Sequence, residues 1–201
     1  DGLINFEVTE AVSGTVLDKD GNELEDRVSN TGLLHADGLA DTADGLLAPM
    51  DRDRRLAVMG SPEVGAFALA VVPTVLLLRV AAIGGAMATD VWPGVCIGVW
   101  ALSRTLMVVS MAAVPYARGR GLASAVATGA RVGHGLWFVP AGALVTFVAG
   151  VPGAGAVLAA AAGGAAVVLL ARRRLGGYTG DILGAAGIVA ETGALLALAA
   201  T

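Results

Sequence analysis

The sequence predicts an all-α protein, a polytopic membrane helix bundle with about five transmembrane helices and an acidic helix on the cytoplasmic face. Hydrophobic residues make up 56% of the chain and charged residues 15%, whereas a soluble domain carries about 25% charged residues. The apolar residues form runs close to the roughly 20 residues that a helix needs to cross about 30 Å of hydrocarbon. Arginines collect in alternate joints between these runs. Nucleic-acid binding has no support, because no basic patch is interleaved with aromatic residues.

Residues 1–30 differ from the rest of the chain and form a polar leader, which we expect to be hairpin-like or disordered. Phe6 and Val8 alternate with acidic residues, and residues 18–23 predict a turn between two short strands. We find no charged segment followed by an apolar core, so no signal peptide is expected. We assign no chemistry to this leader.

The segment 31–50 contains three carboxylates at helical spacing. Asp37, Asp41 and Asp44 stand at i, i+4 and i+7, which places them on one face of a helix. Their oxygens are ligands that Mg²⁺, Mn²⁺ or Ca²⁺ prefer, and the alternative is a solvated acidic face. Glycines follow the first and the last of them, and a helix with two glycines needs close backbone approach. His35, just before this set, is either a hydrogen-bonded structural residue or a group that polarises a nucleophile.

Five apolar runs follow the acidic segment and predict the transmembrane helices. They are residues 64–87, 93–114, 133–150, 153–171 and 182–200. The two joints at 88–92 and 151–152 are short and contain no basic residue, whereas the other two joints are longer and basic.

The basic joints set the predicted orientation. Beyond the leader, the arginines outside the spans fall in three groups: Arg52, Arg54 and Arg55; Arg118, Arg120 and Arg131; and Arg172, Arg173 and Arg174. Five spans in alternation put all three groups on one side, which the positive-inside rule makes cytoplasmic. The acidic segment adjoins the first group and Asp181 adjoins the third, so the carboxylates are expected on the cytoplasmic face, at helix ends.

Three ionisable residues lie inside the predicted spans, where such residues usually face a bundle interior or a wet cavity. Arg104 and Glu191 both lie at a depth of about 15 Å from the cytoplasmic end, counted at 1.5 Å per residue. We therefore predict an ion pair between them, which is either purely structural or in contact with substrate. Arg79 is nearer the far face and is expected to snorkel.

Three glycines around Asp181 recur every four residues. Gly176, Gly180 and Gly184 predict a stripe for tight helix contact, which leaves Asp181, a charge at a helix end, unexplained. His134 is expected to be a hydrogen-bonded structural residue.

Four groups of residues in combination resemble a known enzyme family. They are residues 34–45 (LHADGLADTADG); 51–56 (DRDRRL) with 65–67 (GAF); 103–104 (SR) with 115–118 (PYAR); and 175–185 (LGGYTGDILGA) with Glu191. This pattern resembles the cobalamin synthase family, adenosylcobinamide-GDP ribazoletransferase, from about residue 32 to the C-terminus. Members of that family begin with about two apolar segments, in whose place this chain has the polar leader. We therefore expect the acidic helix to lie along the membrane interface.

The resemblance implies a membrane-embedded transferase domain over residues 31–201, acting in the last stage of vitamin B12 (cobalamin) assembly. Family members join adenosylcobinamide-GDP to α-ribazole or its 5′-phosphate, release GMP and need a divalent metal, usually Mg²⁺. The implied metal ligands are Asp37, Asp41, Asp44 and Asp181, and the implied phosphate-binding residues are Arg52, Arg104 and Arg118. The implied catalytic residues are His35 and Asp41, with His35 or one of the aspartates taking the proton from the ribose hydroxyl.

The implied partners are the two substrates and the lipid bilayer, and a homo-oligomer or other enzymes of the pathway are left open. The implied location is the cytoplasmic (inner) membrane of a bacterium or archaeon, with the active site on the cytoplasmic face. Two alternatives come from other classes: a small membrane transporter or ion carrier, and an inactive fragment that acts as a membrane scaffold. The enzyme interpretation predicts that the aspartates do not tolerate replacement by asparagine, whereas the scaffold tolerates it.

Overall fold

The structure is a computed structural model that describes residues 16–17, 23–24, 34–87, 91–118 and 127–200. Its elements, in chain order, are β1 (Val16–Leu17), β2 (Glu23–Leu24), α1 (Leu34–Leu47), α2 (Arg52–Val58), α3 (Ala66–Met87), α4 (Trp92–Ala113), η1 (Ala127–Gly129), η2 (Val132–Trp137), α6 (Phe138–Leu175) and α7 (Gly180–Ala199). Contacts divide the chain into two units, Asp1–Leu34 and His35–Thr201. In the first unit β1 and β2 pair in antiparallel register. The turn expected between them lies outside the described residues.

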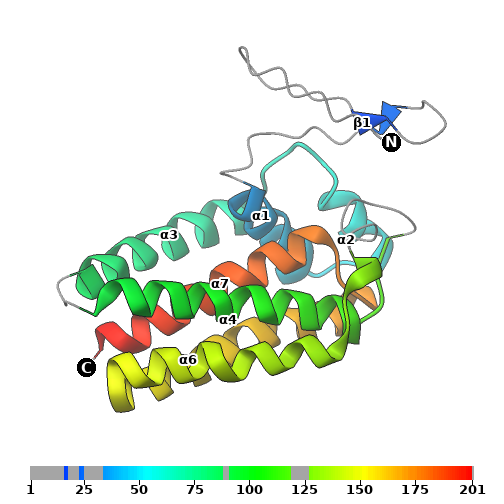
Figure 1. Ribbon diagram of the computed structural model, residues 1–201. Coiled ribbons are helices and arrows are strands. Elements are labelled where there is room, and N and C mark those ends of the chain that lie inside the picture. Colours follow the sequence, from blue (N-terminus) through cyan, green and yellow to red (C-terminus); the bar gives the residue numbers. More distant parts are fainter. Residues whose placement is uncertain (1–15, 18–22, 25–33, 88–90, 119–126, 201) are drawn as a thin grey trace. The chain divides into compact units, whose positions relative to one another are not determined.

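The second unit is a helix bundle, and α7 is its central helix (Figure 1). α7 packs against α3, α4 and α6, and it is the most buried of the membrane-length helices, whereas α3 is the least buried. Within the described ranges, four helical segments are long and apolar enough to cross a membrane, and neither α1 nor α2 is among them. The prediction of an all-α membrane bundle is therefore confirmed.

α6 consists of two arms that fold back on each other at Gly150. Its φ of +63° and ψ of −142° interrupt the helix in a conformation that favours glycine. The arms touch, because a Cβ at Gly142 would lie 3.4 Å from Val157 and a Cβ at Gly153 would clash with the carbonyl oxygen of Val145. Along one straight helix residues 142 and 157 would be about 22 Å apart. The chain therefore reverses between them, in the yellow part of the ribbon (Figure 1), and the arms are the third and fourth predicted runs.

The first arm of α6 reaches membrane length only together with η2, the 3₁₀ helix that precedes it. Residues 138–149 rise 1.5 Å each, and the residues of η2 rise about 2.0 Å each. Over residues 132–149 the total rise is about 30 Å, which matches the thickness of the hydrocarbon core.

Gly176 ends α6 and corrects one prediction. It caps the helix in the left-handed conformation, at φ +78°, and its N–H donates to the carbonyl oxygen of Arg172 at 3.1 Å. Because α7 begins only at Gly180, the predicted stripe of Gly176, Gly180 and Gly184 does not share one helix and is wrong. Gly184 does have a packing role, since a Cβ there would lie 3.3 Å from the Cα atom of His35.

Two glycines let α1 lie close to its neighbours, as the two Asp-Gly pairs predict. A Cβ at Gly38 would come within 2.9 Å of the carbonyl oxygen of Asp181, so the backbone of α1 rests on the first turn of α7. A Cβ at Gly45 would clash with the side chain of Met59. The first contact places α1 against the N-terminal end of α7, and the second places it against the end of α2.

Replacing Gly150 with alanine should destabilise the protein, because the new Cβ would oppose the backbone conformation that reverses α6. We expect a loss of about 1–3 kcal/mol, seen as a lower thermal midpoint of the detergent-solubilised chain. Gly155→Ala is the matched control, since it lies in α6 with no atom within 4 Å of the added Cβ and should be neutral or stabilising. Equal losses in the two variants would contradict a reversal that depends on Gly150.

Candidate functional site

The acidic residues of α1 lie at three depths. Asp37 is exposed, Asp41 is half-buried and Asp44 is buried. Asp181 approaches them from the first turn of α7, where the hydroxyl of Thr179 caps the helix. The negative charges of Asp181 and Asp37 both act on Asp41. The fold therefore brings these three predicted site residues together.

Asp44 has a structural role that its spacing did not reveal. Its Oδ2 accepts a hydrogen bond from the N–H of Gly65 at 2.7 Å, and its Oδ1 accepts one from the N–H of Ala68 at 3.0 Å. Both oxygens thus bind free N–H groups at the start of α3 and stabilise that helix end. Its role as a metal ligand stays a prediction. That role would require a carboxylate oxygen to bind the metal ion as well as the backbone N–H group.

Burial and like charges change the acidity of Asp41. Burial raises the pKa of its carboxyl most, and the charges of Asp181 and Asp37 raise it further, from 3.8 to about 7. The positive charge of Arg118 lowers it in part. The carboxyl therefore exchanges a proton near neutral pH, which suits a group that takes part in proton transfer.

Within residues 34–87, 91–118 and 127–200, no three histidine, cysteine or acidic side chains converge on one metal position. This arrangement is compatible with Mg²⁺, which usually takes one or two protein carboxylates and fills its remaining positions with water and substrate phosphates. It does not suit a metal ion that needs an all-protein cage.

A buried carboxylate on α7 joins three helices. Glu191 Oε1 accepts from the hydroxyl of Ser103 at 2.5 Å and from Arg104 Nη2 at 2.6 Å, and its Oε2 accepts from Arg79 Nη2 at 2.5 Å. The predicted partners Arg104 and Glu191 are thus in contact. A carboxylate that is only 6% exposed needs paired charges and hydrogen bonds, and this network supplies both.

Arg79 belongs to this network, which corrects the expectation that it snorkels toward the far face. Its side chain is 28% exposed, and its guanidinium pairs with Glu191 across the contact between α3 and α7. Counting residues along a helix gives the depth of a side chain but not its direction around the helix axis. That direction is set here by the face of α3 that meets α7.

His35 Nε2 lies 2.8 Å from Arg104 Nη1. Arginine can only donate, so Nε2 carries a lone pair and the neutral ring has its proton on Nδ1. Burial lowers the pKa of His35, and the positive charge of Arg104 lowers it further. The lone pair that a general base would use is therefore occupied by Arg104.

Arg52 and Arg118, both predicted to bind phosphate, differ in what they contact. Arg52 donates from Nε to the carbonyl oxygen of Leu175 at 2.8 Å and from Nη2 to that of Ala117 at 2.9 Å, so it holds the end of α6. Arg118 Nη2 lies 3.5 Å from Asp181 Oδ2 and is buried without a hydrogen-bond partner in the described part of the chain. Arg118 is therefore placed to bind an anion beside the acidic residues, whereas Arg52 is engaged by backbone.

Two arginines to which the sequence analysis assigned no site role fix the end of α1. Arg55 Nη1 donates to the carbonyl oxygens of Gly45 at 2.6 Å and Leu46 at 3.1 Å, and Arg174 also donates to Leu46. Cations at a helix C-terminus bind its free carbonyl groups. The sequence signal was the flanking arginines, but which carbonyl groups they reach depends on the tertiary structure.

Comparison with known proteins identifies the family. The family model described as cobalamin-5-phosphate synthase matches residues 27–199. The chain belongs to this family. Two of the motifs that resembled it, residues 34–45 and 175–185, form α1 and the start of α7, and they meet where Gly38 touches Asp181.

Relatives of this cobalamin-5-phosphate synthase family member are named adenosylcobinamide-GDP ribazoletransferase. The protein of Alkalilimnicola ehrlichii is 41% identical over 172 residues, covering 85% of this chain and 67% of the relative. That of Pseudomonas aeruginosa is 33% identical over 173 residues, covering 86% and 70%. That of Thermosynechococcus vestitus is 35% identical over 174 residues, covering 85% and 68%. No solved structure matches the chain.

Glu191→Gln should destabilise the protein strongly, because two arginines would remain in the bundle without their carboxylate. Breaking a buried charge pair costs about 3–5 kcal/mol, which should lower the thermal midpoint and the folded yield. Thr192→Val is the matched control: Thr192 is buried at the next position of α7, and its hydroxyl has no hydrogen-bond partner among the described residues. If the two variants have the same thermal midpoint, the hydrogen bonds and ion pairs of Glu191 do not hold the helices in place.

Asp41 should make stability depend on pH. Because the pKa of its carboxyl is raised from 3.8 to about 7, the folded protein holds this proton more tightly than the unfolded chain does. That contribution to stability is fully present below about pH 4 and is lost as the pH rises through about 7. The thermal midpoint of the wild type should fall more between pH 5 and pH 8 than that of Asp41→Asn, whose amide does not titrate. Parallel curves would argue against the raised pKa.

Proposed function

We propose that this chain joins adenosylcobinamide-GDP to α-ribazole or its 5′-phosphate and releases GMP, with Mg²⁺ as its metal. One observation carries the proposal: Asp37, Asp41 and Asp181 lie near one another beside the guanidinium of Arg118. Displacing a nucleoside monophosphate from a diphosphate requires groups that position phosphates and neutralise their charge. The name shared by the relatives supports the same substrates.

Asp37, Asp41 and Asp181, which we call the acidic group, supply oxygen atoms of the kind that bind Mg²⁺. Asp37, Asp41 and Asp181 offer hard oxygen ligands, and their mutual repulsion, which contributes to the raised pKa of Asp41, would be relieved by a divalent cation. When bound, Mg²⁺ would neutralise charge on the diphosphate oxygens as GMP leaves. Asp44 would keep its place at the start of α3.

The remaining steps fall to side chains of this chain. The forming bond joins the ribose hydroxyl oxygen of α-ribazole to the phosphorus attached to cobinamide, and the breaking bond joins that phosphorus to the oxygen that leaves with GMP. Arg118 would bind phosphate oxygens through its paired N–H donors, and Arg104 would contribute its positive charge. Asp41, half-buried beside Asp37 and Asp181, would accept the hydroxyl proton. His35 would hold Arg104 in position through Nε2.

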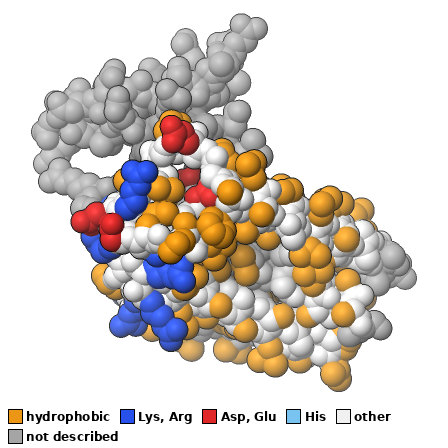
Figure 2. Space-filling model, turned by 180° about the vertical axis from the view of Figure 1, so that it is seen from behind, with side chains coloured by type: hydrophobic (Ala, Val, Ile, Leu, Met, Phe, Trp, Pro, Cys, Tyr) orange, Lys and Arg blue, Asp and Glu red, His pale blue; other side chains and the backbone are white. Residues whose placement is uncertain are grey.

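We infer that the site faces the cytoplasm of a cell whose inner membrane holds this protein. The four apolar helical segments indicate a multi-pass membrane protein. In Figure 2, arginine and acidic side chains gather at one end of the visible face, and apolar side chains cover much of the rest. An excess of arginine marks the cytoplasmic side of a membrane protein, and soluble GMP would be released there.

The test is GMP release by the purified chain given adenosylcobinamide-GDP, α-ribazole and Mg²⁺. We expect release that stops when Mg²⁺ is chelated and that falls about 10²–10⁴-fold in Asp41→Asn, which keeps the shape but loses the base. Glu63→Gln, a change at an exposed acidic residue outside the acidic group, should leave the rate unchanged. A folded Asp41→Asn variant with the wild-type rate would overturn the proposal.

A further inference from the structure

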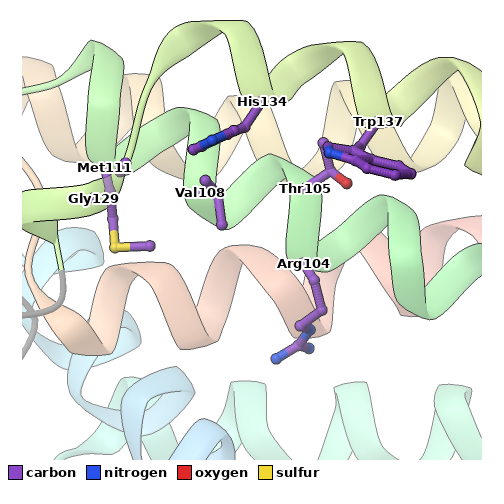
Figure 3. A pocket seen from close by; sticks show the side chains of 8 residues that line it. Arg104, Thr105, Val108, Met111, Gly129, His134 and Trp137 are labelled. Carbon is purple, nitrogen blue, oxygen red and sulfur yellow. The ribbon is translucent and has the colours of Figure 1, made fainter.

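A cavity of about 400 Å³ lies between α4 and the segment that contains η1 and η2 (Figure 3). This volume falls in the range of small-molecule sites. Its walls are mostly apolar: Val108 and Met111 come from one face of α4, Ala130 from the segment before η2, and Trp137 from the end of η2. Such walls favour a flat apolar group, with an aromatic ring to pack against it.

Most polar groups of the cavity are already engaged. The hydroxyl of Thr105 donates to the carbonyl oxygen of Ala101 at 2.8 Å, within α4. The guanidinium of Arg104 uses its three nitrogens on Ser103, His35 and Glu191. In Figure 3 this guanidinium is turned away from the rings of His134 and Trp137, so its aliphatic stem faces the cavity.

His134 contributes the polar group that is still available. Its Nδ1 accepts a hydrogen bond from the backbone N–H of Arg131 at 3.2 Å. A backbone N–H can only donate, so Nδ1 carries the lone pair and the neutral ring has its proton on Nε2. Nε2 makes no hydrogen bond to any described residue. The cavity therefore offers one fixed N–H donor between apolar walls.

We propose that this cavity binds the dimethylbenzimidazole base of α-ribazole, with His134 Nε2–H donating to its unsubstituted ring nitrogen. The inference rests on the proposed function and names the site for one of its substrates. The base is a flat bicyclic ring with two methyl groups and one hydrogen-bond acceptor, which matches apolar walls with one donor. A purine such as guanine carries several donors and acceptors, and burying them without partners is costly.

Arg104 connects the cavity to the two helices that carry the acidic residues, α1 and α7. Arg104 lines the cavity with its stem, and its guanidinium reaches His35 on α1 and Glu191 on α7. A base held at His134 therefore places the attached ribose next to Arg104, on the side where phosphate chemistry would occur. Base recognition and phosphate binding would then share one arginine.

Binding of α-ribazole to the purified full chain, without the second substrate, tests this site by calorimetry. Loss of the donor in His134→Phe should weaken binding about tenfold, while His134→Gln, which restores an N–H, should recover most of the affinity. The wild type should bind an indole riboside, in which a C–H replaces the ring nitrogen, about tenfold more weakly than α-ribazole. His134→Phe should bind the two nucleosides equally. In turnover, the variant should raise KM for α-ribazole and leave KM for adenosylcobinamide-GDP unchanged.

The outcomes separate this site from the proposed function. Discrimination between the two nucleosides without GMP release would overturn the transferase and support the base site. GMP release by a folded His134→Phe variant that binds both nucleosides as the wild type does would overturn the base site. Equal binding of the two nucleosides to the wild type, as expected if the cavity only accommodates a lipid chain, would overturn it as well.

Discussion

The need to neutralise one buried carboxylate sets the geometry of this membrane protein. Glu191 lies on the most buried of the membrane-length helices, and arginines from α3 and α4 must reach it. Because Arg104 gives Nη2 to Glu191, its Nη1 is left for His35 on α1. The charge balance of the core thereby extends to the acidic helix, and the position of the polar site follows from the packing of α7 against α3 and α4.

The arginines near the acidic residues have two different roles. Arg52, Arg55 and Arg174 bind carbonyl oxygens at the ends of α6 and α1, which would otherwise lack partners. Arg118 instead faces the carboxylate of Asp181. An enzyme with short joints between apolar helices has few other groups with which to satisfy helix ends, so most of its positive charge maintains structure and only part of it is available to a substrate anion.

The sequence predicted the features that depend on helix length, on periodicity and on the side of the membrane, but it did not reveal the contacts that depend on direction in space. The thickness of the hydrocarbon core fixes the length of a membrane-spanning helix. Counting residues from the helix ends gave Arg104 and Glu191 the same depth and so predicted their ion pair. Asp44 shares a face with Asp41, yet it caps α3, because only the fold brings the start of α3 to it. Arg52 is chemically as fit for phosphate as Arg118, and the nearby end of α6 decides its role. The cavity at His134 combines segments whose proximity no local pattern reveals.

The reversal of α6 at Gly150 determines the parity of membrane crossings. Counted over the described helices, α3, α4, the two arms of α6 and α7 cross an odd number of times, so the end of α7 emerges on the side opposite α1. A reporter enzyme fused behind α7 would therefore sit across the bilayer from the acidic residues. A single straight α6 would put the same reporter on the side of the acidic residues.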